Sequence, residues 1–337
     1  EGSLVTRPAD PSEAGYTFGG WYKEQGCATA WNFESDVVTA NTILYAKWTA
    51  NTHNLTWNAN GGTLSGSYTS GTVAFSAAIT APTATRTGYT FAGWDNTVPA
   101  TMPDNDLSFT AQWTPNTNTA YVVKHWQQNI ADDNYTEVVA DRENLTGTTG
   151  AEVTPAVKSY EGFTAPIAQT VAIAADGSLV VTYNYTRNKY ALTWEANGGN
   201  ISGNYTKGDV KFGASITAPL NANVTKTGSN FLGWNPSVIP ATMPAETLTF
   251  VAQWEAKTFT GITFTSEDEN EGTVSVNPQK NEYTYGDNVT ITATAAEGYE
   301  FSGWSDGNND VERTITVTES TTSLTATFSP KTNISYT

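Results

Sequence analysis

The sequence has almost none of the side chains from which catalytic and metal sites are usually built. Its 337 residues include one cysteine, two histidines and two methionines. Cys27 alone cannot form an intrachain disulfide or supply the ligand set of a structural zinc site. His53 and His125 lie far apart in the chain, so a Ser-His-Asp or Cys-His arrangement would have to assemble between distant segments. The sequence therefore predicts no enzyme activity and no cofactor.

Basic residues and long apolar runs are also scarce. There are 16 Lys and Arg against 33 Asp and Glu, which gives a net charge of -17. Binding to nucleic acid needs clustered cations that displace the counterions of phosphate, so this class of partner is excluded. No stretch approaches the roughly 20 apolar residues that span a bilayer. We therefore expect no membrane insertion by this part of the chain.

What the chain has in plenty is glycine and aromatic residues. It contains 28 Gly, 11 Trp and 16 Tyr, together with many Thr and Asn. This composition is typical of β-strands joined by polar turns rather than of helices. The predicted fold class is mainly β with minor α.

One motif repeats along the chain. The pattern G-x-x-F-x-G-W occurs four times, at residues 15–21, 88–94, 228–234 and 298–304. Each copy is followed by a segment that alternates in character and ends in an aromatic residue, at 44–48, 109–113, 250–254 and 324–328. Alternation with a period of two predicts a strand with one buried face. A tandem array is the architecture that such internal repeats indicate.

Two copies of the repeat are complete. Each opens with a strand that runs into Asn-Gly-Gly, at 55–62 and at 192–199, and Asn-Gly is a strong hairpin signal. The collinear motifs predict that three tryptophan pairs are equivalent: Trp57 and Trp194, Trp94 and Trp234, and Trp113 and Trp254. We expect Trp94 and Trp234 to be buried, because modules this small need aromatic cores.

Short polar connections divide the chain into five segments. We name them repeat 1 (1–50), repeat 2 (51–117), the middle unit (118–188), repeat 4 (189–256) and repeat 5 (257–337). Connections of a few residues do not behave as free linkers, and they leave too little chain for the segments to fold back on one another. We therefore expect an elongated rod of small modules and a monomer in solution.

The repeated motif resembles the Listeria-Bacteroides repeat, also called the internalin-type B-repeat. Repeat 1, with Cys27 and Trp31-Asn32-Phe33, resembles a compact form, and repeats 2 and 4 resemble a longer form. Repeat 5 is similar to a divergent B-repeat. The middle unit, with Val123-Lys124-His125-Trp126 and Tyr160-Glu161-Gly162-Phe163, resembles a mucin-binding-type repeat. The resemblance implies β-grasp-like (ubiquitin-like) modules in a bacterial cell-surface protein.

Repeat 5 contains the only candidate metal ligands. Asp306, Asn308 and Asp310 place oxygen atoms at alternate positions, as calcium loops do. However, Val311 occupies the sixth position and Val317 the twelfth, where an EF-hand has Gly and Glu. The alternative interpretation is a polar hairpin, and on that basis we predict no metal site and no calcium requirement for folding.

Aromatic residues of the middle unit are the candidates for ligand binding. Trp126, Tyr135 and Tyr160 could line a face that contacts a glycan or peptide, or they could simply pack within the module. Two functional classes remain open. The first is a non-catalytic stalk or spacer, and the alternative is an adhesin that binds a host or cell-surface glycan or protein.

The resemblance and the sequence also predict a location. The start, Glu1-Gly2-Ser3-Leu4, has neither the basic nor the apolar region of a signal peptide, and the chain begins within a repeat. We therefore expect a fragment of a longer exported and anchored protein, located extracellularly at the cell surface.

Overall fold

The computed structural model describes residues 2–332, and it is built almost entirely of strands. Within these residues, helical structure is limited to two three-residue 3₁₀ turns, η1 (Val139–Asp141) and η2 (Asn221–Asn223). The prediction of a mainly β protein is confirmed, while the expected minor α content is reduced to these turns. None of the described helices is long and apolar enough to cross a membrane.

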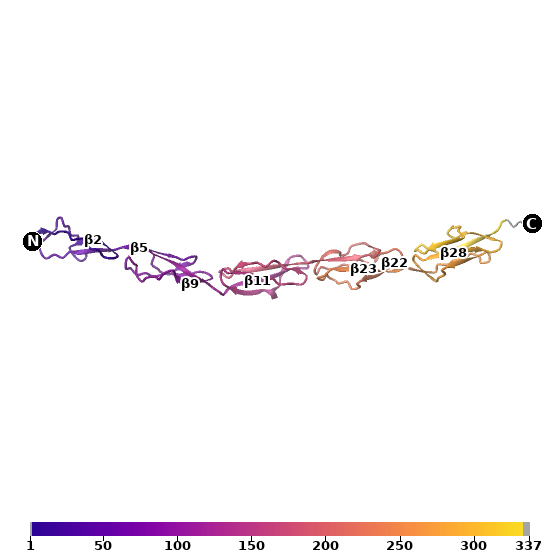
Figure 1. The fold of residues 1–337 in the computed structure, drawn as a ribbon, viewed down its shortest axis with the longest axis horizontal. Coiled ribbons are helices and arrows are strands. Elements are labelled where there is room, and N and C mark those ends of the chain that lie inside the picture. Colours follow the sequence, from indigo (N-terminus) through magenta and orange to yellow (C-terminus); the bar gives the residue numbers. More distant parts are fainter. Residues whose placement is uncertain (1, 333–337) are drawn as a thin grey trace, which may run out of the picture. The chain divides into compact units, whose positions relative to one another are not determined.

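The chain divides into two compact units, and the division runs through the middle unit. Unit 1 holds residues 1–126, 136–158 and 165–184, and unit 2 holds residues 127–135, 159–164 and 185–337. Unit 1 therefore contains repeats 1 and 2, and unit 2 contains repeats 4 and 5. Figure 1 labels strands of each unit by sequence order.

Repeat 1 contains two separate pairs of antiparallel strands. Its strands are β1 (Ser3–Leu4), β2 (Tyr16–Tyr22), β3 (Val37–Val38) and β4 (Tyr45–Ala50). β1 pairs with β3, and β2 pairs with β4. No hydrophobic side chain of residues 2–50 is buried, so this repeat has no closed core of its own.

Repeat 2 is built on a four-stranded mixed sheet. Its strands are β5 (Thr52–Asn58), β6 (Thr63–Ser65), β7 (Gly71–Ala74), β8 (Thr83–Thr85), β9 (Tyr89–Trp94) and β10 (Leu107–Pro115). The sheet order is β7-β5-β10-β9, and β6 and β8 form a separate pair. The first and last strands, β5 and β10, are parallel neighbours at the centre. Leu55, Met102 and Phe109 form the centre of the core, with at most 2% of each side chain exposed.

The middle unit has a five-stranded sheet and a small additional pair. Its strands are β11 (Thr119–Gln128), β12 (Tyr135–Glu137), β13 (Glu143–Gly147), β14 (Glu152–Val153), β15 (Phe163–Thr164), β16 (Val171–Ala172) and β17 (Val180–Arg187). The sheet order is β12-β11-β17-β15, with β13 also paired to β11. β17 alternates strictly between exposed and buried residues, as the period of two predicts.

Repeat 4 reproduces repeat 2. Its strands are β18 (Lys189–Glu195), β19 (Asn200–Ile201), β20 (Gly208–Lys211), β21 (Val224–Thr225), β22 (Ser229–Asn235) and β23 (Leu248–Ala256). The sheet order β20-β18-β23-β22 matches that of repeat 2, and β18 and β23 are again parallel. β22 and β23 lie side by side in unit 2 (Figure 1).

The three predicted tryptophan pairs occupy equivalent places. Trp57 and Trp194 face Phe109 and Phe250 across the parallel pair. Each donates its indole N–H to a backbone oxygen 2.8 Å away, that of Thr69 and that of Thr206. Trp113 and Trp254 bond the carbonyls of Ala59 and Ala196 at 3.0 and 2.9 Å. Trp94 and Trp234 pair with Ala111 and Ala252. The expectation of burial holds for Trp234, which is 8% exposed, whereas Trp94 is only half-buried.

Repeat 5 has the same parallel strand pair and antiparallel neighbour as repeats 2 and 4, but it contains more strands. These are β24 (Thr258–Thr260), β25 (Phe264–Ser266), β26 (Gly272–Asn277), β27 (Glu282–Thr284), β28 (Asn288–Ala295), β29 (Tyr299–Trp304), β30 (Glu312–Thr316) and β31 (Leu324–Pro330). β25 and β31 are parallel, and β29 completes a three-stranded sheet. A second sheet, β26-β28-β30, supplies Val289 and Ile291 to the core.

The second glycine of the repeated motif marks a β-bulge in every copy. Gly20, Gly93, Gly233 and Gly303 have φ values of 108°, 113°, 128° and 149°, which side chains rarely adopt. The register of the antiparallel pair shifts beside each of them. The bulge bends the strand and so sets the direction of the tryptophan side chain that follows it.

Candidate functional site

The aromatic candidates of the middle unit do not share one surface. Tyr135, on β12, exchanges a hydrogen bond of 3.1 Å with the hydroxyl of Thr186. Tyr160 makes an edge-to-face contact with Tyr185, at 4.7 Å between ring centroids. Thr186 is exposed and Tyr185 is buried, and successive residues of a strand point to opposite faces. The two tyrosines therefore lie against opposite faces of β17.

Trp126 is half-buried near the end of β11. Its indole N–H is buried and has no hydrogen-bond acceptor among residues 2–332. A buried donor of this kind costs free energy unless a water or a ligand satisfies it. Of the three aromatic candidates, Trp126 is the one with an unused polar group.

The three calcium candidates lie in the turn between β29 and β30, where they bond one another and an arginine. Arg313 donates hydrogen bonds of 2.9 and 2.8 Å to the two carboxylate oxygens of Asp306. Asn308 donates through its side chain to Asp310, and accepts from the Asp310 backbone N–H. Partial burial raises the pKa of Asp306, but the N–H of Asn308 and the Arg313 cation outweigh it and hold the pKa below its usual value.

No group of three or more His, Cys, Asp or Glu side chains in residues 2–332 is arranged to hold a metal ion. In the structure Asp306, Asn308 and Asp310 lie in a polar turn, with the Arg313 guanidinium bonded to the Asp306 carboxylate, and the absence of a calcium requirement stays a prediction.

The feature that recurs through the molecule is the contact between consecutive segments. At each boundary one residue donates its backbone N–H to the carbonyl of a glycine in the preceding segment, over 2.8–2.9 Å; this is the first glycine of the motif at three boundaries and Gly162 at the other. The pairs are Asn51 with Gly15, Asn116 with Gly88, Asn188 with Gly162, and Lys257 with Gly228. The carbonyl of the same residue accepts a hydrogen bond from the following segment, from Phe75, Thr149, Phe212 and Tyr285 in turn. We call this arrangement the joint.

The glycine of each joint makes room for the next segment. All four joint glycines have positive φ, between 68° and 78°. A Cβ added at Gly15, Gly162 or Gly228 would overlap the ring of Phe75, Phe212 or Tyr285. At Gly88 it would lie 2.6 Å from the carbonyl oxygen of Ala175. The glycine is thus required both by the turn and by the close approach of the neighbouring segment.

Side chains reinforce the joints in different ways. At the first three joints a threonine two residues after the glycine donates to the asparagine amide oxygen, from Thr17, Thr90 and Thr164. At the first joint Asp104 also accepts hydrogen bonds from Gly15 N, from Asn51 and from His53. These bonds from Asn51 and His53 lower the pKa of Asp104.

The joint between the middle unit and repeat 4 has a charged network. The Arg187 side chain, only 4% exposed, donates to the carbonyl of Phe212 and forms an ion pair of 2.9 Å with Asp133. Lys211 lies 2.6 Å from the other oxygen of Asp133. These two cations lower the pKa of Asp133, Lys211 contributing the larger effect. Lys257 replaces the joint asparagine at the last joint and pairs with Glu319.

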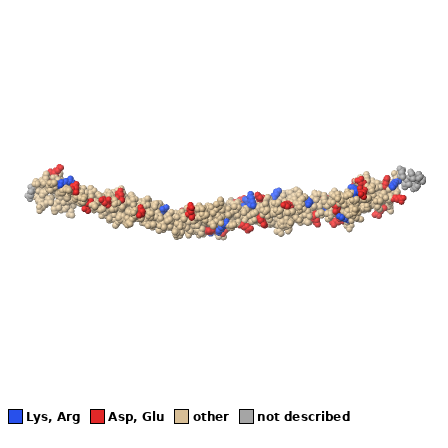
Figure 2. Space-filling model, viewed as in Figure 1, with Lys and Arg blue, Asp and Glu red and all other residues tan. Residues whose placement is uncertain are grey.

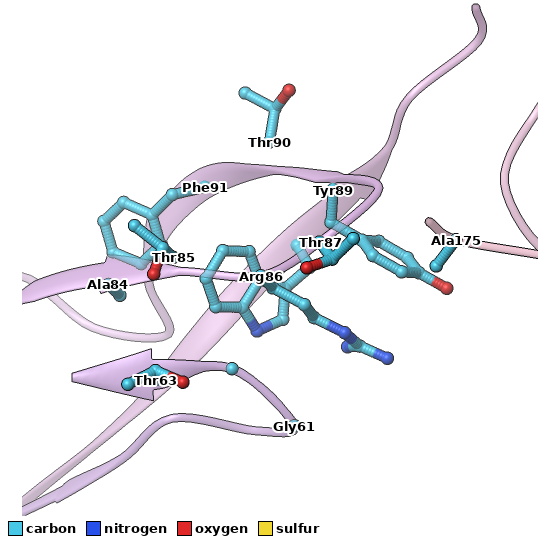
Figure 3. Close-up of a pocket in the computed structure, with 12 residues that line it drawn as sticks. Gly61, Thr63, Ala84, Thr85, Arg86, Thr87, Tyr89, Thr90, Phe91 and Ala175 are labelled. Atoms are coloured by element: carbon cyan, nitrogen blue, oxygen red, sulfur yellow. The ribbon is translucent and has the colours of Figure 1, made fainter. Parts of the chain in front are cut away.

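A surface hollow of about 850 Å³ lies beside the joint between repeat 2 and the middle unit (Figure 3). The Arg86 guanidinium lies 4.0 Å from the centroid of the Tyr89 ring and donates to the carbonyl of Asn60. Ala175 of the middle unit lines the hollow opposite Tyr89. The hollow offers a cation, an aromatic ring and threonine hydroxyls to a ligand.

Sequence reasoning located the short connections between segments but did not find the hydrogen bonds that form the joints. It identified Gly15, Gly88 and Gly228 as parts of the repeated motif, but it did not predict that these three glycines and Gly162 contact the next segment. The sequence gives no common signal for these contacts, because Gly15, Gly88 and Gly162 directly precede an aromatic residue whereas Gly228 precedes Ser229. Acidic and basic side chains are interspersed on the face that Figure 2 shows.

The fold and the joints define a tandem array of small β-repeats. The family model described as the Listeria-Bacteroides repeat domain matches residues 1–47, 53–124 and 190–253. A second model, the divergent InlB B-repeat domain, matches residues 262–332. The chain therefore belongs to the Listeria-Bacteroides repeat family. Residues 125–189 lie outside both matches, so the mucin-binding-type resemblance of the middle unit stays a prediction.

Three relatives illustrate the similarity. A protein of Evansella cellulosilytica named as a membrane protein is 23% identical over 322 residues, covering 91% of this chain and 37% of the relative. A Gly-rich protein named as a membrane protein, from the same organism, is 25% identical over 250 residues, covering 69% and 27%. Internalin H of Listeria monocytogenes is 32% identical over 126 residues, covering 34% and 22%. The chain thus spans less than two-fifths of these relatives, and the similarities indicate an exported or surface repeat protein.

Proposed function

We propose that this chain is a non-catalytic spacer, a stalk that holds another part of a bacterial surface protein away from the cell. The observation that carries the proposal is the joint, which recurs at four boundaries with the same backbone hydrogen bonds. A flexible tether would need no such recurring contact, because a polar linker alone connects domains. A repeated joint instead favours a fixed relation between neighbouring segments.

The sheet order supports the β-grasp-like modules that the family resemblance implies. In repeats 2 and 4 the first and last strands are parallel at the centre, and antiparallel strands flank them on each side. A chain that enters and leaves such a module by parallel strands advances by the length of the module. Modules of this type are therefore suited to a spacer.

Small-angle X-ray scattering tests the spacer function. A compact protein of this length has a radius of gyration of about 20 Å. Five modules in line, each about 30 Å long, would give a value on the order of 45 Å. We expect the larger value and a single species at the mass of a monomer. A radius within a few Å of the compact estimate would contradict the spacer function.

The second candidate is an adhesin, and two observations favour it. The Arg86–Tyr89 hollow offers aromatic and charged contacts, and Trp126 carries an unused buried donor. A host or cell-surface glycan or protein would be the partner. A glycan array probed with the whole chain, with Arg86→Ala and with Trp126→Phe tests this function. Binding that both variants retain would place any ligand elsewhere.

A further inference from the structure

The first and last strands of repeats 2 and 4 lie side by side and run in the same direction. Leu55 to Asn58 of β5 pair with Leu107 to Thr110 of β10. Leu192 to Glu195 of β18 pair in the same way with Leu248 to Val251 of β23. The chain therefore enters and leaves each repeat through one hydrogen-bonded strand pair.

The parallel arrangement determines how a pulling force acts on these repeats. In repeat 2 the chain enters at Thr52, and it leaves at Pro115, which extends past the far end of β5. Tension along the chain pulls these ends in opposite directions and slides β5 along β10. All bonds between the two strands are then loaded together. Strands pulled apart from one end would instead lose their bonds one after another.

Side chains across the same strand pair oppose sliding. The Trp57 ring stacks on Phe109, with 4.8 Å between centroids and 27° between planes. Trp194 and Phe250 repeat this contact at 4.6 Å and 23°. Sliding the strands by one residue would break both the stacking and the register that keeps apolar side chains on the core face. The stacked aromatic pair therefore adds to the resistance of the backbone bonds.

Repeat 1 provides an internal contrast. Its hairpin strands are antiparallel, and Tyr16, where the chain enters β2, pairs with Ala50, where the chain leaves β4. Tension applied at these neighbouring ends opens the hairpin one residue pair at a time. No parallel strand pair is present in residues 2–50.

We propose that repeats 2 and 4 bear tensile load, with β5–β10 and β18–β23 as the strand pairs that resist it. Repeat 5 has a shorter version, in which three residues of β25 pair with β31. Repeat 1 yields first. This inference rests on the proposed spacer function, because only a segment between an anchor and a distal domain would carry such a load.

Single-molecule force spectroscopy with two pulling directions tests the inference on the whole chain. In a Cys27→Ser background, Thr52→Cys and Thr114→Cys place handles at the two ends of the β5–β10 pair. A second variant with Thr52→Cys and Thr72→Cys pulls β5 from its antiparallel neighbour β7 across the pair, since Thr72 pairs with Asn54, two residues along β5 from Thr52. Thr52, Thr72 and Thr114 are exposed, so both variants should fold alike. Equal melting temperatures would check this.

We expect a rupture force several-fold higher across Thr52 and Thr114 than across Thr52 and Thr72. Forced unfolding is governed by the unfolding rate, so equal stability does not imply equal force. Equal forces in the two directions would overturn the load-bearing inference. Scattering decides the spacer function separately, since a compact radius would contradict the spacer while leaving the directional difference intact.

Pulling the whole chain from its ends gives a second readout. Opening the repeat 1 hairpin releases 35 residues (16–50), and opening repeat 2 releases 64 (52–115). At 3.3–3.6 Å per residue these extensions are about 120 Å and about 220 Å, before subtracting the folded length. We expect the short step at the lowest force. Short steps that appear only after the long ones would contradict the inference.

Discussion

Repeats 1 and 2 contain the same aromatic hairpin but differ in what surrounds it. Both have the G-Y-T-F-x-G-W strand paired to a closing strand, with a bulge at the second glycine. In repeat 2 the opening strand β5 lies against β10 and buries Phe109 to 2% exposure. Within residues 2–50 no third strand pairs with the hairpin, and Phe18, Trp21 and Trp48 are only partly buried. The motif therefore defines a hairpin, and the opening strand makes it a closed module.

The largest expected effect separates buried from half-buried tryptophans. Trp234→Ala should cost about 3–5 kcal/mol, because it removes a ring that packs 4.8 Å from Trp194 in a closed core. Trp21→Ala, at the same motif position of repeat 1, should cost clearly less. Hydrogen exchange read by mass spectrometry measures each repeat separately, which suits a chain that does not unfold in one step. Similar costs at both positions would show that repeat 1 has a closed core after all.

Joint glycines give the next largest effect. Gly228→Ala should weaken the contact between repeats 4 and 5, because its Cβ overlaps the Tyr285 ring. Gly298→Ala is the matched control, since Gly298 also has positive φ, at 88°, but no atom lies within 4 Å of the added Cβ. Both variants should lose about 1–2 kcal/mol from the left-handed backbone.

Only Gly228→Ala should also increase exchange of the Lys257 and Tyr285 amides, which the joint protects. Equal exchange at these two amides in both variants would show that the joint does not depend on the glycine. Scattering of the same two proteins would show whether the contact also restricts motion between the repeats.

A smaller effect comes from the Asn-Gly turn. Asn60 has φ of 47° and donates its side-chain amide to the carbonyl of Ala111, which ties the opening strand to β10. Asn60→Asp keeps the turn preference but removes the donor, and should cost about 1 kcal/mol. Asn58→Asp is the control, because the Asn58 side chain accepts a hydrogen bond that a carboxylate also accepts. Thermal unfolding should show a lower melting temperature for Asn60→Asp than for Asn58→Asp. Equal melting temperatures would show that the hydrogen bond from Asn60 to Ala111 does not stabilise the repeat.

The smallest expected effect is a pH dependence at the first joint. Because hydrogen bonds from Asn51 and His53 lower the pKa of Asp104 from 3.8, its contribution is complete above pH 3.8 and is lost as pH falls through the lowered value. Exchange of the Gly15 amide, which bonds Asp104 over 3.2 Å, should rise in that acid range beyond the intrinsic change. Asp104→Asn should remove this acid dependence. An unchanged acid dependence in that variant would show that a group other than Asp104 causes it.

Much of the repeat could be read from the sequence. The alternating strands, the Asn-Gly turns and the equivalence of Trp57 with Trp194 all follow from local patterns that the structure keeps. The family followed from the same motif. The binding surface of the middle unit was harder to predict. The sequence allowed Tyr135 and Tyr160 to share one surface, but in the fold they lie against opposite faces of β17.

The sequence by itself determined the strands, the turns and the number of motif copies, because side-chain alternation and glycine act within a few residues of the chain. Tertiary structure decided which strands became neighbours. It therefore decided that β5 pairs in parallel with β10, although paired residues such as Leu55 and Leu107 are 52 positions apart in the sequence. It also decided that Gly15, Gly88, Gly162 and Gly228 contact the next segment. Such contacts depend on backbone approach between distant residues, which no local pattern records.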